Sequence, residues 1–83
     1  MKRFLYFSAP WCGPCRQLGP TMDQVALNYP VRKINIDENP LLAQQYKIKN
    51  IPTVLVIDDD GDVLSSKTGA YPAQTYIDMY HQN

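Results

Sequence analysis

The stretch "SAPWCGPCRQLGP", residues 8–20, contains both cysteines of this 83-residue chain. Cys12 and Cys15 are separated by Gly13 and Pro14, and Trp11 precedes them. Behind the pair, apolar side chains recur at spacings of four, three and four, at Leu18, Met22, Val25 and Tyr29. Such spacing places these side chains on one face of a helix. The stretch therefore predicts a helix that begins at about Cys12.

Two prolines are expected to shape this helix. Pro20 lies inside the apolar pattern and should kink the helix, because its ring removes a backbone hydrogen bond. Pro30 follows the last apolar position and should end the helix.

Cysteines three residues apart at the start of a helix suit disulfide exchange. Cys15 would lie one turn after Cys12 on nearly the same face, so the two sulfurs can close a disulfide ring with little backbone movement. Cys12 would lie among unpaired backbone N–H groups at the positive end of the helix dipole. A free cysteine has a pKa of about 8.5, and a helix N-terminus lowers it. We therefore expect Cys12 to be the attacking thiol, more exposed and more acidic than Cys15, which is the resolving thiol.

Metal binding and inert packing are the alternative interpretations of this pair. A structural zinc site needs four ligands, and the chain adds only His81, three residues from its C-terminal end. We therefore expect no metal here. Free cysteines also pack as small apolar residues, but the helix start and Trp11 argue against a purely structural role. The acidic run after Ile57 does not fit a calcium loop, because Val56 stands where a ligand is needed relative to Gly61.

Four segments have the composition of strands. Residues 3–8 are aromatic-rich, and residues 31–37 alternate, with Ile34 and Ile36 on one face. Residues 53–58 form a nearly continuous apolar run that is rich in β-branched side chains, as in a buried strand. An Asp-Gly pair at 60–61 predicts a tight turn into a partner strand at 63–68.

Two further helices complete the predicted fold. Residues 39–46 should form a short helix with Asn39 as cap and Pro40 at its first position. A closing helix should start near Pro72, with an apolar face formed by Ala73, Tyr76, Ile77 and Tyr80. The order β-α-β-α-β-β-α predicts a single α/β domain over residues 1–83. Its four-stranded sheet would be mixed, with a right-handed parallel crossover first, an antiparallel pair last and helices on both faces.

The composition limits the classes of partner. Eight basic and eight acidic side chains leave a net charge of zero, which argues against nucleic acid or an anionic membrane surface. The apolar run at residues 4–7 is too short for a signal peptide, and no run reaches the length of a membrane span. We therefore expect a cytoplasmic protein. Thiols are mostly reduced there, so a structural disulfide is a poor explanation for the pair.

With these residues in view, the chain resembles the thioredoxin family over nearly its whole length from Phe4. The motif "WCGPC", residues 11–15, matches the family's active-site motif residue for residue. Pro20 corresponds to the kinking proline of the family's active-site helix, and "KINIDENP", residues 33–40, resembles its next strand and helix start. "YKIKNIPTVLVI", residues 46–57, resembles the segment that carries the family's cis-proline, here Pro52. "TGAY", residues 68–71, resembles the loop whose glycine, here Gly69, lines the substrate groove.

The resemblance implies a thioredoxin-like fold and a thiol–disulfide oxidoreductase that reduces protein disulfides through Cys12 and Cys15. Backbone groups of Ile51 would pair with an extended substrate chain. The implied partners are disulfide-bearing proteins and a reductase such as thioredoxin reductase or glutathione, acting on a monomer without a cofactor. The implied substrate surface consists of Trp11, Gly13, Pro14, Ile51, Pro52, Thr53, Gly69 and Ala70. A glutaredoxin-like protein recycled by glutathione and a binding module without redox turnover are the alternatives.

Two departures from the family pattern affect these expectations. Thioredoxins begin with an additional strand and helix that have no counterpart in this sequence, so the strand at residues 31–37 should form an exposed edge, protected by Arg32 and Lys33. The family also places a buried aspartate six residues before its first cysteine, where Tyr6 stands here, whereas the matching lysine, Lys33, is kept. Tyr6 is either core filling or a hydroxyl that relays a proton.

Overall fold

The computed structural model describes residues 1–82, and its elements follow the predicted order. The strands lie close to the predicted ranges: β1 (Arg3–Ser8), β2 (Val31–Asn35), β3 (Thr53–Ile57) and β4 (Val63–Thr68). The helices are α1 (Gly13–Ala26), α2 (Pro40–Gln45) and α3 (Ala73–His81). The predicted element order is therefore confirmed.

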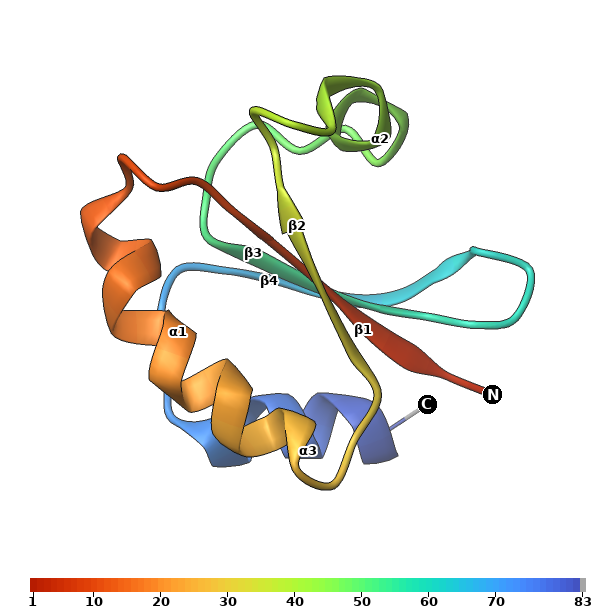
Figure 1. The fold of residues 1–83 in the computed structure, drawn as a ribbon. Coiled ribbons are helices and arrows are strands. Elements are labelled where there is room, and N and C mark those ends of the chain that lie inside the picture. Colours follow the sequence, from red (N-terminus) through yellow and green to blue (C-terminus); the bar gives the residue numbers. More distant parts are fainter. Residues whose placement is uncertain (83) are drawn as a thin grey trace.

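The four strands form one mixed sheet in the order β2-β1-β3-β4 (Figure 1). Strand β1 pairs in parallel with β2, and β3 pairs antiparallel with both β1 and β4. Strand β2 is thus an edge strand, as expected, and Arg32 and Lys33 are exposed along it. The parallel pair needs a crossover, which α1 provides.

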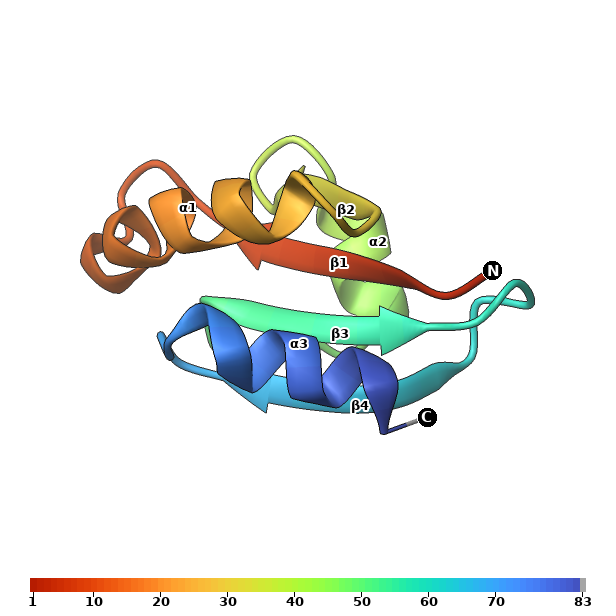
Figure 2. The same ribbon diagram turned by 90° about the horizontal axis from the view of Figure 1, so that it is seen from below.

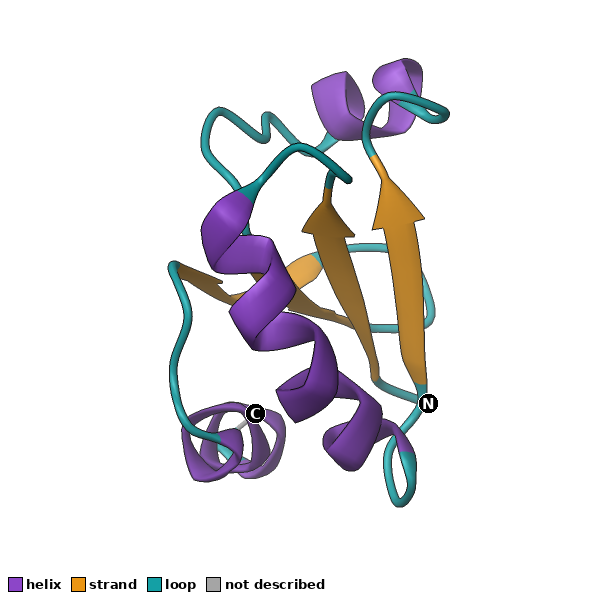
Figure 3. Cartoon of the chain, turned by 60° about the vertical axis from the view of Figure 1, so that its left-hand side comes forward, coloured by secondary structure: helices purple, strands orange, loops and turns teal. Residues whose placement is uncertain are grey.

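Helices cover both faces of the sheet. Alternate side chains of β1 point to opposite faces, so Phe4 and Tyr6 pack with α1 and α3, whereas Leu5 and Phe7 pack on the α2 side. Figure 1 shows α2 separated from α1 and α3 by the sheet, and Figure 3 shows α1 running alongside β1. In Figure 2, α3 lies along β3 and β4. All five residues of β3 are buried, which explains its continuous apolar run.

Helix α1 ends earlier than predicted. Its last residue is Ala26, whereas the apolar pattern extended the helix to Tyr29. Tyr29 instead follows a tight turn in which its N–H donates to the carbonyl of Val25 at 3.0 Å. Its ring packs on Phe4 and Tyr80. The residue before a proline is disfavoured in helical conformation, so Pro30 acts on the chain before it.

Two details of the other helices also differ from prediction. Asn39 precedes α2, but its side chain makes no cap hydrogen bond and donates instead to the carbonyl of Asn35 at 3.1 Å. On α3, Ile77 lies outside the core, and Met79 is buried beside Tyr76 in its place. The inner face of α3 is set by its contact with α1, which a single-helix pattern does not contain.

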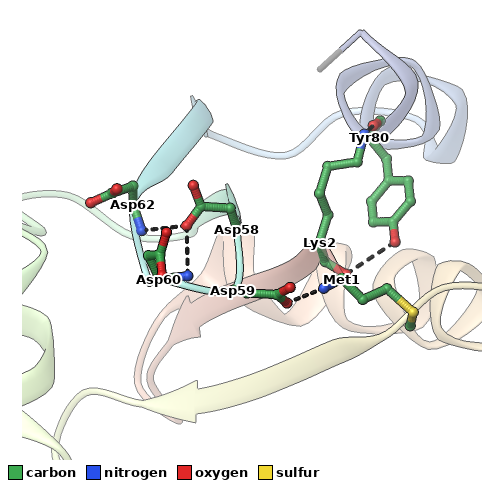
Figure 4. A network of polar contacts seen from close by, with 7 residues as sticks. All are labelled: Met1, Lys2, Asp58, Asp59, Asp60, Asp62 and Tyr80. Carbon is green, nitrogen blue, oxygen red and sulfur yellow. Dashed lines mark hydrogen bonds and ion pairs between the residues drawn. The ribbon is translucent and has the colours of Figure 1, made fainter.

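The N-terminal residues are tied to the β3–β4 turn and to α3 (Figure 4). The terminal ammonium of Met1 forms an ion pair with Asp59, and the Tyr80 hydroxyl donates to the carbonyl of Lys2 at 3.0 Å. Within the turn, Oδ1 of Asp58 accepts hydrogen bonds from the N–H groups of Asp60 and Asp62 at 2.9 and 3.0 Å. The acidic run therefore organises a turn, as predicted.

In residues 1–82, no helix is both long enough and apolar enough to cross a membrane.

Candidate active site

The two cysteines lie where the loop after β1 enters α1, and they form a disulfide. Cys12 is the N-cap residue, and its sulfur accepts a hydrogen bond from the N–H of Cys15 at 3.2 Å. The Cα atoms are 5.2 Å apart. The sequence placed Cys12 at this helix start correctly. The expected difference in exposure is not seen in the disulfide form, where Cys12 is 6% and Cys15 5% exposed.

The loop before β3 brings a second backbone segment to the sulfurs. The peptide bond between Ile51 and Pro52 is cis, as the resemblance implied. The carbonyl oxygen of Ile51 lies 3.9 Å from Sγ of Cys12. A third segment joins them, because the N–H of Gly69 donates to the carbonyl of Pro52 at 2.9 Å. Three chain segments far apart in the sequence thus meet around Cys12.

The predicted substrate-surface residues differ in exposure. Trp11 is 64% exposed, and its Nε1–H donates to Oδ2 of Asp37 at 3.0 Å. Ile51 is half-buried, whereas Pro52 and Thr53 are buried. The Thr53 hydroxyl bonds internally to the carbonyl of Asn50. The exposed or half-exposed members of the predicted surface are Trp11, Gly13, Pro14, Ile51, Gly69 and Ala70.

The side chain of Tyr6, on strand β1, contacts the first turn of α1. Its hydroxyl donates to the backbone carbonyl of Cys15 at 2.9 Å. Burial raises the pKa of Tyr6 above its ordinary value, which a hydrogen bond with Ser8 and the charge of Lys33 offset only in part. The phenol is therefore neutral at physiological pH and donates its proton to the backbone. A pocket of about 250 Å³ opens beside it, lined by Tyr6, Ser8, Ala9, Pro10, Cys15, Arg16 and Asn35.

Lys33 lies opposite Tyr6 in the β1–β2 register. Its ammonium group, however, forms an ion pair with Asp23 on α1, and its side chain is 53% exposed. The positive charge of Lys33 is therefore paired with a carboxylate at the surface.

Sequence reasoning missed two residues that support the site. Asp37 accepts a hydrogen bond from the Trp11 ring, whereas the sequence pattern predicts only the end of a strand at this residue. The Tyr76 hydroxyl donates to the carbonyl of Gly69 and accepts from the N–H of Tyr71, both at 3.2 Å. The sequence pattern places Tyr76 only on the apolar face of a helix. Its hydrogen-bond partners lie in the loop after β4 and are defined only by the packing of α3.

One group of side chains has the spacing of metal ligands. Carboxylate oxygens of Asp58, Asp60 and Asp62 lie within 4.8 Å of one another. These groups are in the β3–β4 turn, and one Asp58 oxygen already accepts two backbone hydrogen bonds. The cluster is explained by the turn.

Comparison with known proteins agrees with this arrangement. The thioredoxin family model matches residues 2–82. Thioredoxin 1 of Synechococcus elongatus is 45% identical over an alignment of 73 residues that covers 83% of this chain and 67% of that protein. The thioredoxin of Chlorobaculum thiosulfatiphilum is 47% identical over an alignment of 70 residues that covers 80% of this chain and 64% of that protein. The chain thus spans about two thirds of the length of these relatives.

Solved structures show the same fold. A thioredoxin variant from Halobacterium salinarum superposes with a TM-score of 0.88 at 30% identity, over 98% of this chain and 73% of that one. Thioredoxin-2, described as a component of malaria parasite protein secretion machinery, gives a TM-score of 0.90 at 24% identity, over 100% and 84% of the two chains. The second likeness concerns the fold alone. The chain belongs to the thioredoxin family, and its Cys12–Cys15 pair makes it a thiol–disulfide oxidoreductase.

Proposed function

We propose that the protein reduces disulfides of other proteins, with Cys12 as the nucleophile and Cys15 as the resolving thiol. The observation that carries this proposal is the position of Cys12 at the N-cap of α1, beside the Ile51 carbonyl. Unpaired N–H groups at a helix N-terminus stabilise a thiolate, which is the attacking species. A buried structural disulfide would not need an exposed tryptophan beside it.

The reaction consists of two exchanges. The Cys12 thiolate attacks one sulfur of the substrate disulfide, forms a mixed disulfide and releases the other substrate sulfur as a thiolate. Cys15 then loses its proton and attacks the Cys12 sulfur, which releases the second substrate thiol. The protein is left with the Cys12–Cys15 disulfide, and the substrate has gained two electrons and two protons.

Proton loss from Cys15 proceeds without a buried carboxylate at position 6. The Tyr6 phenol is neutral and bonds to the backbone, so it supplies no base. The pocket that Cys15 borders is large enough for several water molecules. Water in this pocket, or the departing thiolate, would accept the Cys15 proton.

Substrate binding would use the surface between Trp11 and Ala70. An extended substrate segment would pair with backbone groups of Ile51, in the manner of strand addition. Trp11, Gly13, Pro14, Pro52 and Gly69 would border it, whereas Thr53 would act through the backbone because its side chain is buried.

The disulfide left after each turnover must be reduced by a partner that supplies two electrons. We expect thioredoxin reductase in preference to glutathione, acting in the cytoplasm on a monomeric protein. The two sources are compared by measuring reduction of a protein disulfide with NADPH and thioredoxin reductase, or with glutathione alone. Faster turnover with glutathione alone would reverse the preference.

The roles of the two cysteines are tested by trapping. Cys15→Ser should accumulate a mixed disulfide with an oxidised protein substrate, because attack occurs but resolution does not. Cys12→Ser, the matched control, should form none at the same pH. Mass spectrometry of the non-reduced mixture detects the adduct. An adduct on Cys15 of the Cys12→Ser variant, formed as fast as that on Cys12, would contradict the assignment.

A further inference from the structure

The loop after β4 presents an aromatic ring at the margin of the active site. Tyr71 is 40% exposed. A Cβ atom built on Gly69 would lie 3.3 Å from Cε2 of Tyr71, so the ring packs directly against this glycine. The N–H of Gly69 donates to the carbonyl of Pro52, so the Tyr71 ring contacts a residue that is itself bonded to the cis-proline.

The buried side chain of Tyr76 holds this loop in place. The Tyr76 hydroxyl, in a residue that is 0% exposed, bonds to the carbonyl of Gly69 and to the N–H of Tyr71. A loop fixed at both of these backbone groups loses little conformational entropy when a partner binds. The position of the Tyr71 ring is therefore set before a substrate arrives.

A cation lies on this ring. Nζ of Lys67 is 4.7 Å from the centroid of the Tyr71 ring. The ion pairs of Met1 with Asp59 and of Lys33 with Asp23 do not involve Lys67. The ring restrains the ammonium group without removing its positive charge.

A second group of cations lies on the face of strands β3 and β4 opposite to Lys67. A pocket of about 160 Å³ is lined by Lys47 and Lys49 together with Thr53 and Thr68. These threonines are the chain neighbours of Pro52 and Gly69. No carboxylate belongs to the lining of this pocket. The acidic group that the site uses, Asp37, accepts its hydrogen bond from Trp11 and not from these lysines.

We propose that Lys67, positioned by Tyr71, makes the protein prefer disulfide substrates with an acidic residue flanking the attacked cysteine. This inference rests on the proposed function, because it places the substrate segment over Gly69. An extended segment there would bring a flanking carboxylate toward the ammonium group of Lys67. Opposite charges across such a surface favour one partner over another chiefly through the rate of association.

The test uses three synthetic peptides, each closed by one disulfide and identical except for Glu, Gln or Lys beside one cysteine. The rate constant for the reaction of each peptide with the fully reduced protein is measured at low ionic strength. We expect the order Glu, Gln, Lys, with about a twofold to fivefold difference between Glu and Lys, the size of an exposed charge interaction. The difference should shrink in high salt, because exposed charges are screened.

Variants assign the preference to Lys67. Lys67→Gln should reduce the Glu-to-Lys rate ratio toward one, and Lys67→Glu should invert it. Lys67→Arg should keep it, since a guanidinium also stacks on an aromatic ring. Arg32→Gln, a matched loss of one positive charge on the edge strand β2, should leave the ratio unchanged.

The outcomes separate this inference from the proposed function. Equal rates for the three peptides, or a ratio that survives Lys67→Gln, would overturn the role of Lys67 while leaving the reductase activity in place. Failure to reduce even the Gln peptide would overturn the proposed function, and the preference with it.

Discussion

The hydroxyl of Tyr6 donates a hydrogen bond of 2.9 Å to the backbone carbonyl of Cys15. The bond joins the middle of strand β1 to the first turn of α1, and both residues are buried. The phenol therefore supports the backbone of the resolving cysteine and directs its proton away from the sulfur. Of the two roles expected for Tyr6, this geometry favours a structural one.

Removal of the Tyr6 hydroxyl should therefore affect stability more than resolution. Tyr6→Phe keeps the ring but loses one buried hydrogen bond, which should lower the free energy of unfolding by about 0.5–1.5 kcal/mol. The rate at which Cys15 resolves the mixed disulfide should change by less than about tenfold. Urea unfolding and rapid-mixing kinetics measure the two effects. A larger loss of rate with the fold intact would show that the hydroxyl takes part in proton transfer.

A carboxylate at position 6 should make stability and resolution depend on pH. Burial raises the pKa of a carboxyl group, so Tyr6→Asp should lose stability as the pH rises from about 3.9, the ordinary aspartate pKa, to the raised pKa in the folded state. The resolution rate should gain a titration step over the same range.

The matched control for this carboxylate is Tyr6→Asn, which has a similar shape and does not ionise. Both variants also lose the aromatic ring, so only their difference reports ionisation. Urea unfolding at several pH values measures it, and identical pH profiles for the two variants would refute the prediction.

Two tyrosines should ionise late in an alkaline titration. Burial raises the pKa of both Tyr6 and Tyr76 above the ordinary value of 10.0. In the unfolded chain they ionise at the ordinary value, so the stability they contribute is present below about pH 10 and falls as the pH rises above it. Tyrosinate absorbance should show the late step, and Tyr6→Phe should reduce it. An unchanged late step in the variant would contradict the assignment.

Two glycine-to-alanine changes should differ in their effect on stability. Gly69 has φ +104° and a neighbouring Tyr71 ring, so Gly69→Ala should destabilise the fold by about 1–3 kcal/mol. Gly19 lies within α1, where no other segment comes within 4 Å of an added Cβ, but it directly precedes Pro20. Gly19→Ala should therefore change the free energy of unfolding by less than about 1 kcal/mol, because the proline restricts the residue before it and offsets the gain in helix propensity. Thermal unfolding compares them, and equal effects would count against the strained loop.

The reduced protein should react with a limiting alkylating reagent mainly at Cys12. The exposures of the two cysteines are nearly equal in the disulfide form, so the expected selectivity comes from the lower thiol pKa at the helix N-cap. Peptide mapping after labelling near neutral pH locates the adduct. Selectivity should fall as the pH rises toward about 8.5, where both thiols ionise. Preferential labelling of Cys15 would refute the prediction.

Local patterns determined much of this protein. The apolar run of β3, the Asp-Gly turn and the position of Cys12 at a helix start all depend on neighbours within a few residues. The spacing of the thiols likewise follows from one helical turn. These features could be predicted because backbone preferences and side-chain periodicity act over such short distances.

Only the tertiary structure decided which distant groups meet. Ile51 is 39 residues from Cys12, yet its carbonyl lies beside the sulfur. The Tyr76 contact with Gly69 and the burial of Met79 in place of Ile77 depend on how α3 docks. The early end of α1 likewise accompanies the packing of Tyr29 on Phe4. Such contacts are settled by the packing of whole elements against one another, because burying apolar surface outweighs the small preferences of any single segment.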